Sequence, residues 1–172
     1  KTKKKTGIAA ITIKDGDELA AVTLVKDEPL MVLTGKGMGI KFGSLEVSAT
    51  SRATSGVKGM ALNEGDYVVA ALPIRNANDS LAVFVESGLG KKISLDEFVT
   101  QKRGGKGIIT YKTNEKTGDV TSAALISDED NLLVCGLASS ICVSATEIPS
   151  AGRVSIGNQI LKGTKLLSVT KV

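Results

Sequence analysis

The chain has 172 residues, of which 42% are apolar, 23% charged and 3% aromatic, so it can bury a core. It has no histidine, which removes the commonest general base and the commonest neutral metal ligand, and two cysteines alone do not suit a structural zinc site. The formal net charge is +4, but the lysines at positions 1, 3, 4 and 5 supply all of it, so net charge alone does not predict nucleic-acid binding.

The first fifty residues have the pattern of four short strands separated by turns. These segments are rich in valine, isoleucine, threonine and leucine, and they cover Gly7–Ile13, Leu19–Val25, Leu30–Thr34 and Gly39–Phe42. Gly16 and Gly37 lie in the turns, where glycine supplies a positive φ without steric cost. No stretch has a helical period of useful length.

The same pattern returns in the next fifty residues. Its expected strands are Val57–Leu62, Tyr67–Leu72, Leu81–Val85 and Lys91–Ile93. Gly65 and the segment Ser87–Gly90 take the turn positions. A third apolar run begins at Leu132, and it follows Leu30 and Leu81 at equal intervals of 51 residues.

A basic signature marks each repeat: one basic residue, three variable residues and a glycine. It covers Lys3–Gly7, Arg52–Gly56, Arg103–Gly107 and Arg153–Gly157, at intervals of 49, 51 and 50 residues. Periods of this size are typical of solenoids, propellers and arrays. The chain is therefore interpreted as one repeat domain over residues 1–172, with repeats at about 3–51, 52–102 and 103–152 and a partial repeat at 153–172.

Four strands per repeat predict one four-stranded blade per repeat, and a row of blades predicts an all-β, propeller-like fold. About three blades and a partial one do not close a ring. We therefore expect a fragment of a larger domain, whose open sheet edges need capping, a partner or further blades.

The two cysteines lie close together in the third repeat. Cys135 and Cys142 would be opposite each other if Ala138 and Ser139 form a hairpin turn, which makes a disulfide geometrically conceivable. The favoured interpretation is that both are free, small apolar residues of a strand pair.

One signature is more basic than the others. Three cations and three glycines lie together in the segment formed by Gln101, Lys102, Arg103, Gly104, Gly105, Lys106 and Gly107. The glycines let the backbone approach a phosphate and offer its N–H groups, while the cations neutralise the phosphate charge. A solvated basic turn is the alternative for such a loop taken alone.

This segment, QKRGGKG, resembles the QRRGGKG box in the C-terminal domain of the DNA gyrase A protein, with Lys102 in place of arginine. The likeness covers essentially the whole chain, because Arg52–Val69 and Gly7–Leu19 resemble the family's blade signature RATxGVxGIxLxEGDxVV. The resemblance implies a β-pinwheel of roughly six blades. It also implies strands exchanged between neighbouring blades, and duplex DNA wrapped around a basic outer rim.

The same resemblance implies partners and location. In gyrase the wrap directs negative supercoiling, whereas in the A protein of topoisomerase IV the domain steers substrate choice. Gyrase has the box in its first blade, while here two repeats precede it, so topoisomerase IV stays as the alternative. The implied partners are double-stranded DNA, the remainder of the topoisomerase A protein and the ATPase component of the enzyme. No cofactor is implied, and the catalytic tyrosine belongs to a different domain, so no catalytic or metal-binding residue is expected.

The implied location is cytoplasmic and nucleoid-associated. It agrees with the sequence, which has no apolar run of membrane-spanning length and no secretory signal, so no membrane partner is expected.

The residues expected to bind DNA are basic groups repeated along the chain, since each neutralised phosphate releases counterions. Lys102, Arg103 and Lys106 come first, with Gln101 and the glycines of the box. The track is extended by Arg52, Lys58, Lys91, Lys92, Lys41 and Arg153. For Arg52 and Arg153 the alternative is an ion pair with the acid six positions upstream. Few aromatic residues and no base-reading element predict little sequence specificity.

Two other classes of function remain open. A protein-interaction propeller would recruit proteins through its loops, but it should expose aromatic or apolar hot spots, and aromatic residues are few here. An enzyme with a site at the ring centre is the other class, but the chain has no histidine and no convergent set of acids for such a site. A non-catalytic DNA-wrapping domain is therefore the favoured prediction.

Overall fold

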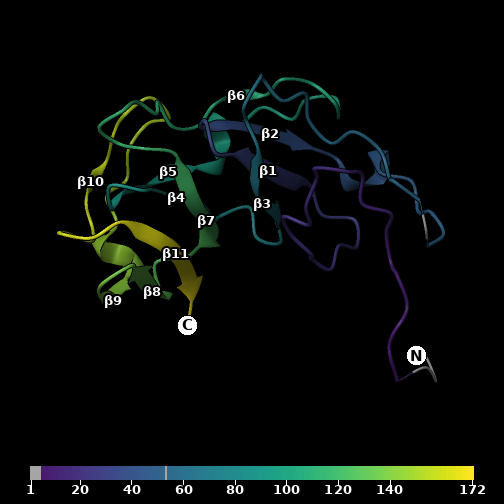
Figure 1. Cartoon of the computed structure of the whole chain (residues 1–172). Helices are drawn as coiled ribbons and strands as arrows, with labels where there is room; N and C mark the ends of the chain where they lie inside the picture. The colour runs from purple at the N-terminus through teal and green to yellow at the C-terminus, as the bar shows by residue number, and fades with distance from the viewer. Residues whose placement is uncertain (1–4, 53) are drawn as a thin grey trace.

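The computed structural model describes residues 5–52 and 54–172 (Figure 1); Lys3, which begins the first basic signature, lies outside them. None of the described helices is long and apolar enough to cross a membrane. The strands are β1 (Leu30–Thr34), β2 (Met38–Phe42), β3 (Val68–Pro73), β4 (Ser80–Val85), β5 (Leu89–Ser94), β6 (Ile108–Ile109), β7 (Val120–Ile126), β8 (Asn131–Gly136), β9 (Ser140–Ser144), β10 (Asn158–Gln159) and β11 (Leu166–Lys171). Short 3-10 turns follow three of them: η1 (Ser44–Glu46), η2 (Leu95–Glu97) and η3 (Ala145–Glu147).

Each sheet contains one antiparallel hairpin, β1–β2, β4–β5 or β8–β9, and the first two of these hairpins form the centres of their sheets. β1 covers the residues that the sequence predicts, and β2, β4 and β5 lie within about two residues of their predicted bounds. Gly37 and Gly88 turn the first two hairpins with φ of 80° and 83°. Gly16 and Gly65 have φ of 78° and 69°, so positive φ at the predicted turn glycines is confirmed.

Strands from later repeats complete each sheet. β3 pairs with β1 and β6 pairs with β2, which gives the order β3-β1-β2-β6. The second sheet has the order β10-β5-β4-β7, and the third has the order β11-β8-β9. The prediction of one blade per repeat is therefore wrong. The flanking strands of each blade come from the segments that follow its hairpin in the sequence. The strand exchange implied by the resemblance is confirmed.

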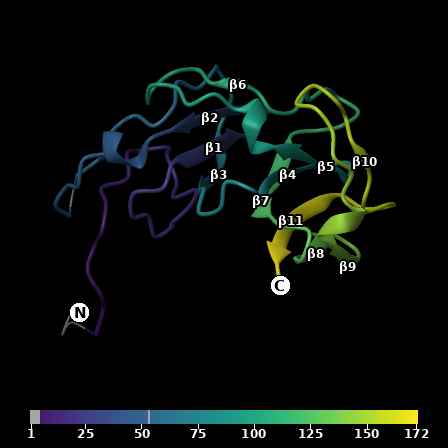
Figure 2. The ribbon, with the colours of Figure 1, turned by 180° about the vertical axis from the view of Figure 1, so that it is seen from behind.

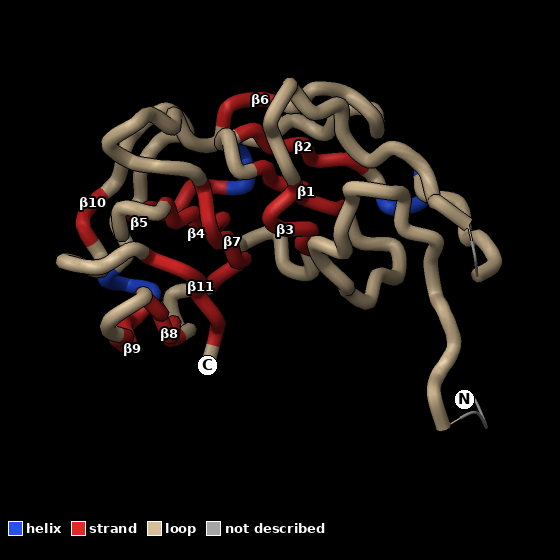
Figure 3. Tube along the Cα trace, viewed as in Figure 1, coloured by secondary structure: helices blue, strands red, loops and turns tan. Residues whose placement is uncertain are grey.

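The sheets lie side by side in an open arc (Figures 1 and 2). β3, β7 and β11 follow one another along the inner side, where β7 packs against both of the others, and β6 and β10 lie on the outer side. Figure 3 shows that loops make up much of the outer side. The signature segments Arg103–Gly107 and Arg153–Gly157 lead into β6 and β10, so they lie on this outer side.

Apolar side chains buried between neighbouring sheets form the core. One cluster joins Met31 of β1 to Val83 of β4 and to Tyr111, and another joins Phe84 of β4 to Leu166 of β11. Because each cluster contains side chains of two neighbouring blades, burial of apolar surface holds each blade to the next one.

Three predicted strands, Gly7–Ile13, Leu19–Val25 and Val57–Leu62, are not strands in the structure. In repeat register Leu19–Val25 corresponds to β3, and the other two correspond to β6 with its flanks. β3 and β6 both pair with the β1–β2 hairpin, whereas no hairpin in the described part of the chain pairs with these three segments. Ladder hydrogen bonds need a neighbour, so the apolar pattern alone does not produce a strand. Val22 and Leu24 are accordingly 83% and 87% exposed.

The cysteines do not lie opposite each other. Cys135 pairs with Ser140, and Cys142 pairs with Leu133, so the two are offset along the hairpin and both are free. The hairpin turn is therefore not at Ala138 and Ser139, so the condition for facing cysteines is not met.

Candidate nucleic-acid interface

The glycine of the basic signature allows two chain segments to approach closely. Gly107 and Gly157 both have φ of 72°, in the left-handed region. A Cβ at Gly107 would collide with the carbonyl group of Gly39, and one at Gly157 would collide with that of Gly90. The glycine thus brings β6 onto β2 and β10 onto β5, so it has a role in the fold whether or not it also faces a phosphate.

The arginine of the signature is bound by protein groups. Arg103 Nε donates to the carbonyl oxygen of Glu46 at 2.9 Å, and Nη1 donates to the carbonyl oxygen of Lys58 at 2.5 Å. The backbone N–H of Arg103 donates to Oε2 of Glu46 at 2.9 Å. Arg103 therefore ties the box loop, residues 101–107, to η1 and to the preceding segment, residues 54–61.

Arg153 repeats two of these three bonds one repeat later. Its Nη1 donates to the carbonyl oxygen of Ile109 at 3.0 Å, and its backbone N–H donates to Oε2 of Glu97 at 3.2 Å. The guanidinium Nε also lies 3.6 Å from that carboxylate oxygen. The alternative considered for Arg153, an ion pair with Glu147 six positions upstream, is therefore wrong. Glu46 and Glu97 bond to Arg103 and Arg153, each two repeats further along the chain, because strands such as β6 pair with a hairpin of an earlier repeat.

The alternative interpretation from the sequence paired these glutamates with the wrong arginines. Each of Glu46, Glu97 and Glu147 ends a 3-10 turn. Glu147 instead accepts the backbone N–H of Ser144 at 2.9 Å, in a capping box. The recurrence of the glutamate was visible in the sequence, but its partner could be found only with the strand exchange known.

The box loop presents its lysines to solvent. Lys102 and Lys106 are exposed, whereas the other members, Gln101, Arg103, Gly104, Gly105 and Gly107, are half-buried. The backbone N–H of Gly104 donates to the carbonyl oxygen of Gly59 at 2.8 Å. The loop therefore runs beside the preceding segment.

Lys58 of the preceding segment is exposed too, and so is Arg52. Ala61 donates its N–H to the carbonyl oxygen of Gly105 at 2.9 Å, and Thr12 donates to that of Thr54 at 3.1 Å, which is the same bond one repeat earlier. Consecutive signature segments are therefore bonded to each other, and the structure brings together the exposed lysines at positions 58, 102 and 106.

Lys91 has a different environment. It is fully buried, and its Nζ donates to the carbonyl oxygens of Gly152, Arg153 and Ser155 at 2.9, 2.5 and 2.7 Å. Burial lowers the pKa of Lys91 from 10.5 to about 8. This burial argues against the expectation that Lys91 contacts DNA, because its ammonium group supports the 152–155 loop from within.

Lys92 and Lys41 occupy equivalent positions in the second and first hairpins. Lys92 is only 9% exposed, and its Nζ lies 2.5 Å from Oδ1 of Asp128 and donates to the carbonyl oxygen of Ala145 at 3.2 Å. Lys41 is half-buried and donates to the carbonyl oxygen of Leu95 at 3.3 Å. Both ammonium groups face protein oxygens, and the burial of Lys92 argues against its place in the DNA track.

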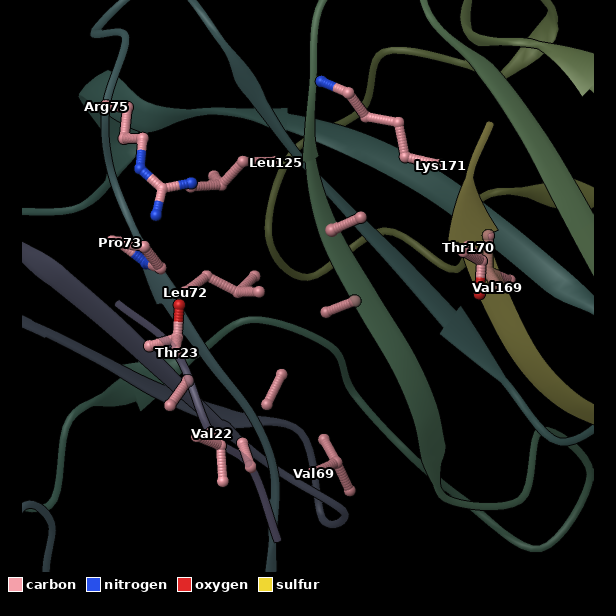
Figure 4. A pocket seen from close by; sticks show the side chains of 15 residues that line it. Val22, Thr23, Val69, Leu72, Pro73, Arg75, Leu125, Val169, Thr170 and Lys171 are labelled. Atoms are coloured by element: carbon pink, nitrogen blue, oxygen red, sulfur yellow. The ribbon is translucent and has the colours of Figure 1, made fainter. Parts of the chain in front are cut away.

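A groove of about 750 Å³ follows the inner strands (Figure 4). Apolar side chains such as Leu72 and Leu125 line it, and the cations Arg75 and Lys171 lie at its border. Arg75 pairs with Glu28 at 3.7 Å, and Lys171 pairs with Asp130 at 2.8 Å. These lining residues include no carboxylate, histidine or cysteine, and the described part of the chain has no cluster of metal-ligating side chains. The groove thus offers no set of groups for acid–base chemistry.

Hairpins completed by strands of later repeats, arranged in an arc, define a β-pinwheel of the propeller class. The family described as DNA gyrase C-terminal domain, beta-propeller, matches residues 1–26, 28–75 and 79–127. The chain belongs to this family, the C-terminal domain of the A proteins of gyrase and topoisomerase IV.

Curated relatives agree with this assignment. The DNA gyrase A protein of Lawsonia intracellularis is 38% identical over 163 residues, which cover 92% of this chain and 20% of that protein. The DNA gyrase A protein of Helicobacter pylori is 37% identical over 160 residues, which cover 91% of this chain and 19% of that protein. The chain thus spans about a fifth of the length of these relatives.

Two solved structures share the fold. The C-terminal domain of DNA gyrase A superposes with a TM-score of 0.89 at 32% identity, covering 97% of this chain and 58% of that one. The C-terminal domain of DNA topoisomerase IV superposes with a TM-score of 0.90 at 27% identity, covering 95% and 52%. The predicted all-β pinwheel is confirmed, and the chain spans part of the domain.

Proposed function

We propose that the chain is a non-catalytic DNA-wrapping domain of a bacterial type IIA topoisomerase of the gyrase kind. It binds duplex DNA without sequence specificity on the outer side of the arc. The observation that carries the proposal is that Lys58 on the 54–61 segment and Lys102 and Lys106 on the box loop are exposed, and that these two segments bond directly to each other.

Electrostatics supports this surface as a phosphate track. Each lysine that neutralises a phosphate releases counterions, so a row of lysines gives affinity without base contacts. Bending a duplex by 40–90° costs on the order of 1–6 kcal/mol, so contacts must be repeated along the path to offset it. Successive blades repeat the signature segments along the arc, which supplies such a path.

The relatives support gyrase as the parent enzyme. Similar curated proteins include the DNA gyrase A proteins of several bacteria, which favours gyrase over topoisomerase IV as the source. In that enzyme the wrap directs negative supercoiling. The partners are duplex DNA in the cytoplasmic nucleoid, the remainder of the gyrase A protein and the ATPase component.

The first experiment compares binding to duplexes of about 150 and 20 base pairs across a salt series. We expect a preference for the long duplex and a steep fall of affinity with salt. In the triple variant Lys58→Ala/Lys102→Ala/Lys106→Ala the slope of log K against log salt should fall by about 3.

The matched control removes the same charge elsewhere. The lysines replaced by alanine in it are Lys26, Lys116 and Lys162, which are also exposed. It should keep most of the slope. Equal losses in the two triple variants would show that net charge, and not this surface, binds the duplex. Absent binding by the unmodified chain would sink the proposal and favour a protein-binding propeller.

A further inference from the structure

We infer that Arg103 and Glu46 are positioning residues, which hold the lysines of two signature segments in one continuous phosphate track. The inference rests on the proposed function. It assigns to the signature arginine a role other than contact with phosphate, and it gives an acidic residue a role in binding an anionic duplex.

The guanidinium group of Arg103 already makes directed bonds within the protein. Nε bonds to the carbonyl oxygen of Glu46, and Nη1 bonds to that of Lys58, at 2.9 and 2.5 Å. These bonds direct the Nε and Nη1 edges of the guanidinium to protein oxygens, and the residue is half-buried. A fork of donors held in this way fixes geometry, which a flexible lysine cannot do.

The bond from Arg103 to Lys58 links the two parts of the track. The carbonyl that receives Nη1 belongs to a residue whose own side chain is exposed. Arg103 is itself flanked in the box loop by the exposed Lys102 and, three residues on, by Lys106. One guanidinium group therefore sets the separation between the cations of the two segments.

Glu46 holds the same loop through its side chain as well. Its Oε2 accepts the backbone N–H of Arg103, the third residue of the box loop, at 2.9 Å. Arg153 repeats two of the three Arg103 bonds one repeat later: its backbone N–H donates to Glu97 Oε2 at 3.2 Å, and its Nη1 donates to the carbonyl oxygen of Ile109 at 3.0 Å. A contact that recurs with the same atoms in two repeats is a property of the repeat and not of one loop.

The experiment uses substitutions for which charge and positioning predict opposite results. Glu46→Ala removes a negative charge near the track, so a purely electrostatic surface would bind DNA more tightly. Positioning predicts weaker binding, with a salt slope lower by about 2, because Lys102 and Lys106 lose alignment although neither is changed. Glu46→Gln keeps an acceptor for the Arg103 N–H and should retain the full slope. Asp96→Ala, the matched loss of an exposed acid, should bind at least as tightly as the unmodified chain.

Arg103→Lys keeps the charge and removes the fork. It should lower the slope in the same way as Glu46→Ala, and it provides the test if the alanine variant does not fold. Unchanged slopes in Glu46→Ala and Arg103→Lys, with steep salt-dependent binding by the unmodified chain, would overturn positioning and leave the proposed function intact. No binding by the unmodified chain would overturn both.

Discussion

The Nζ atom of Lys91 lies 4.8 Å from the centroid of the Tyr111 ring, and both side chains are buried. Tyr111 donates its hydroxyl to the carbonyl oxygen of Ile156, and burial raises its pKa to about 12. These two polar side chains together support the loop that ends in β10. In the preceding repeat the equivalent residues are Ile40 and Met60, which are buried and apolar. Equivalent segments of two repeats are thus supported by different side chains, polar in one repeat and apolar in the other.

Replacing Lys91 by methionine tests this polar support. Methionine fills similar space but leaves three loop carbonyls without their donor, so we expect the free energy of unfolding to fall by about 1–3 kcal/mol. Urea unfolding at neutral pH measures it. Lys112→Met, which changes an exposed lysine, should alter stability by less than about 0.5 kcal/mol. Equal stability of the two variants would mean that the hydrogen bonds of Lys91 have no net effect.

Lys91 should also make stability depend on pH. Its pKa is about 8 in the folded protein and 10.5 as an ordinary lysine, so between these values the unfolded chain binds more protons at this position. Its contribution to the free energy of unfolding therefore rises as pH increases through this window, and it is least favourable below pH 8. The quantity to measure is the difference in unfolding free energy between the unmodified chain and Lys91→Met from about pH 7.5 to 10. A difference that stays flat or falls would contradict the sign.

The sequence predicted the hairpins, whose two strands are local partners. The β1–β2 hairpin pairs residues a few positions apart around Gly37, so its strand pattern and turn glycine specify it without the rest of the chain. Leu19–Val25 has the same apolar pattern, but its structure depends on a hairpin elsewhere. The apolar pattern of one segment does not show whether a hairpin is available to pair with it.

The candidate site was also predictable only where the local sequence determines the environment of a residue. Lys102 and Lys106 lie in a glycine-rich loop, and they are exposed as expected. In the sequence Lys91 and Lys92 look as suitable for binding DNA as the box lysines. Both are buried in the structure, because a loop from a later repeat covers strand β5. The partner of Glu46 was hidden for the same reason, since it lies 57 residues away.

Gly107→Ala tests the close approach between β6 and β2. Alanine at a φ of 72° costs about 1–2 kcal/mol, and the added Cβ also collides with the carbonyl group of Gly39. We expect urea unfolding to show a loss of stability beyond the backbone cost by at least about 1 kcal/mol.

Gly56→Ala is the matched control for that collision. Gly56 has a φ of 71°, but a Cβ there meets no atom within 4 Å, so only the backbone cost applies. If both alanine variants lose the same stability, the approach of β6 to β2 does not require glycine for space.

An ion pair between blades gives the last prediction. Lys36 Nζ donates to both carboxylate oxygens of Asp119 at 2.9 Å, and the next pair of blades has Lys165 and Glu86 at 2.7 Å with the charges in reversed order. The Lys36 and Asp119 side chains are 48% and 23% exposed, so solvent screens the attraction. A double-mutant cycle of Lys36→Ala and Asp119→Ala should give a coupling free energy of about 0.2–1 kcal/mol, and it should shrink in high salt. Asp119 also accepts from the Tyr67 hydroxyl at 3.2 Å, so Asp119→Ala alone should cost more than Lys36→Ala alone. A coupling well above this range, insensitive to salt, would mean that the pair is shielded from solvent and helps to hold the blades together.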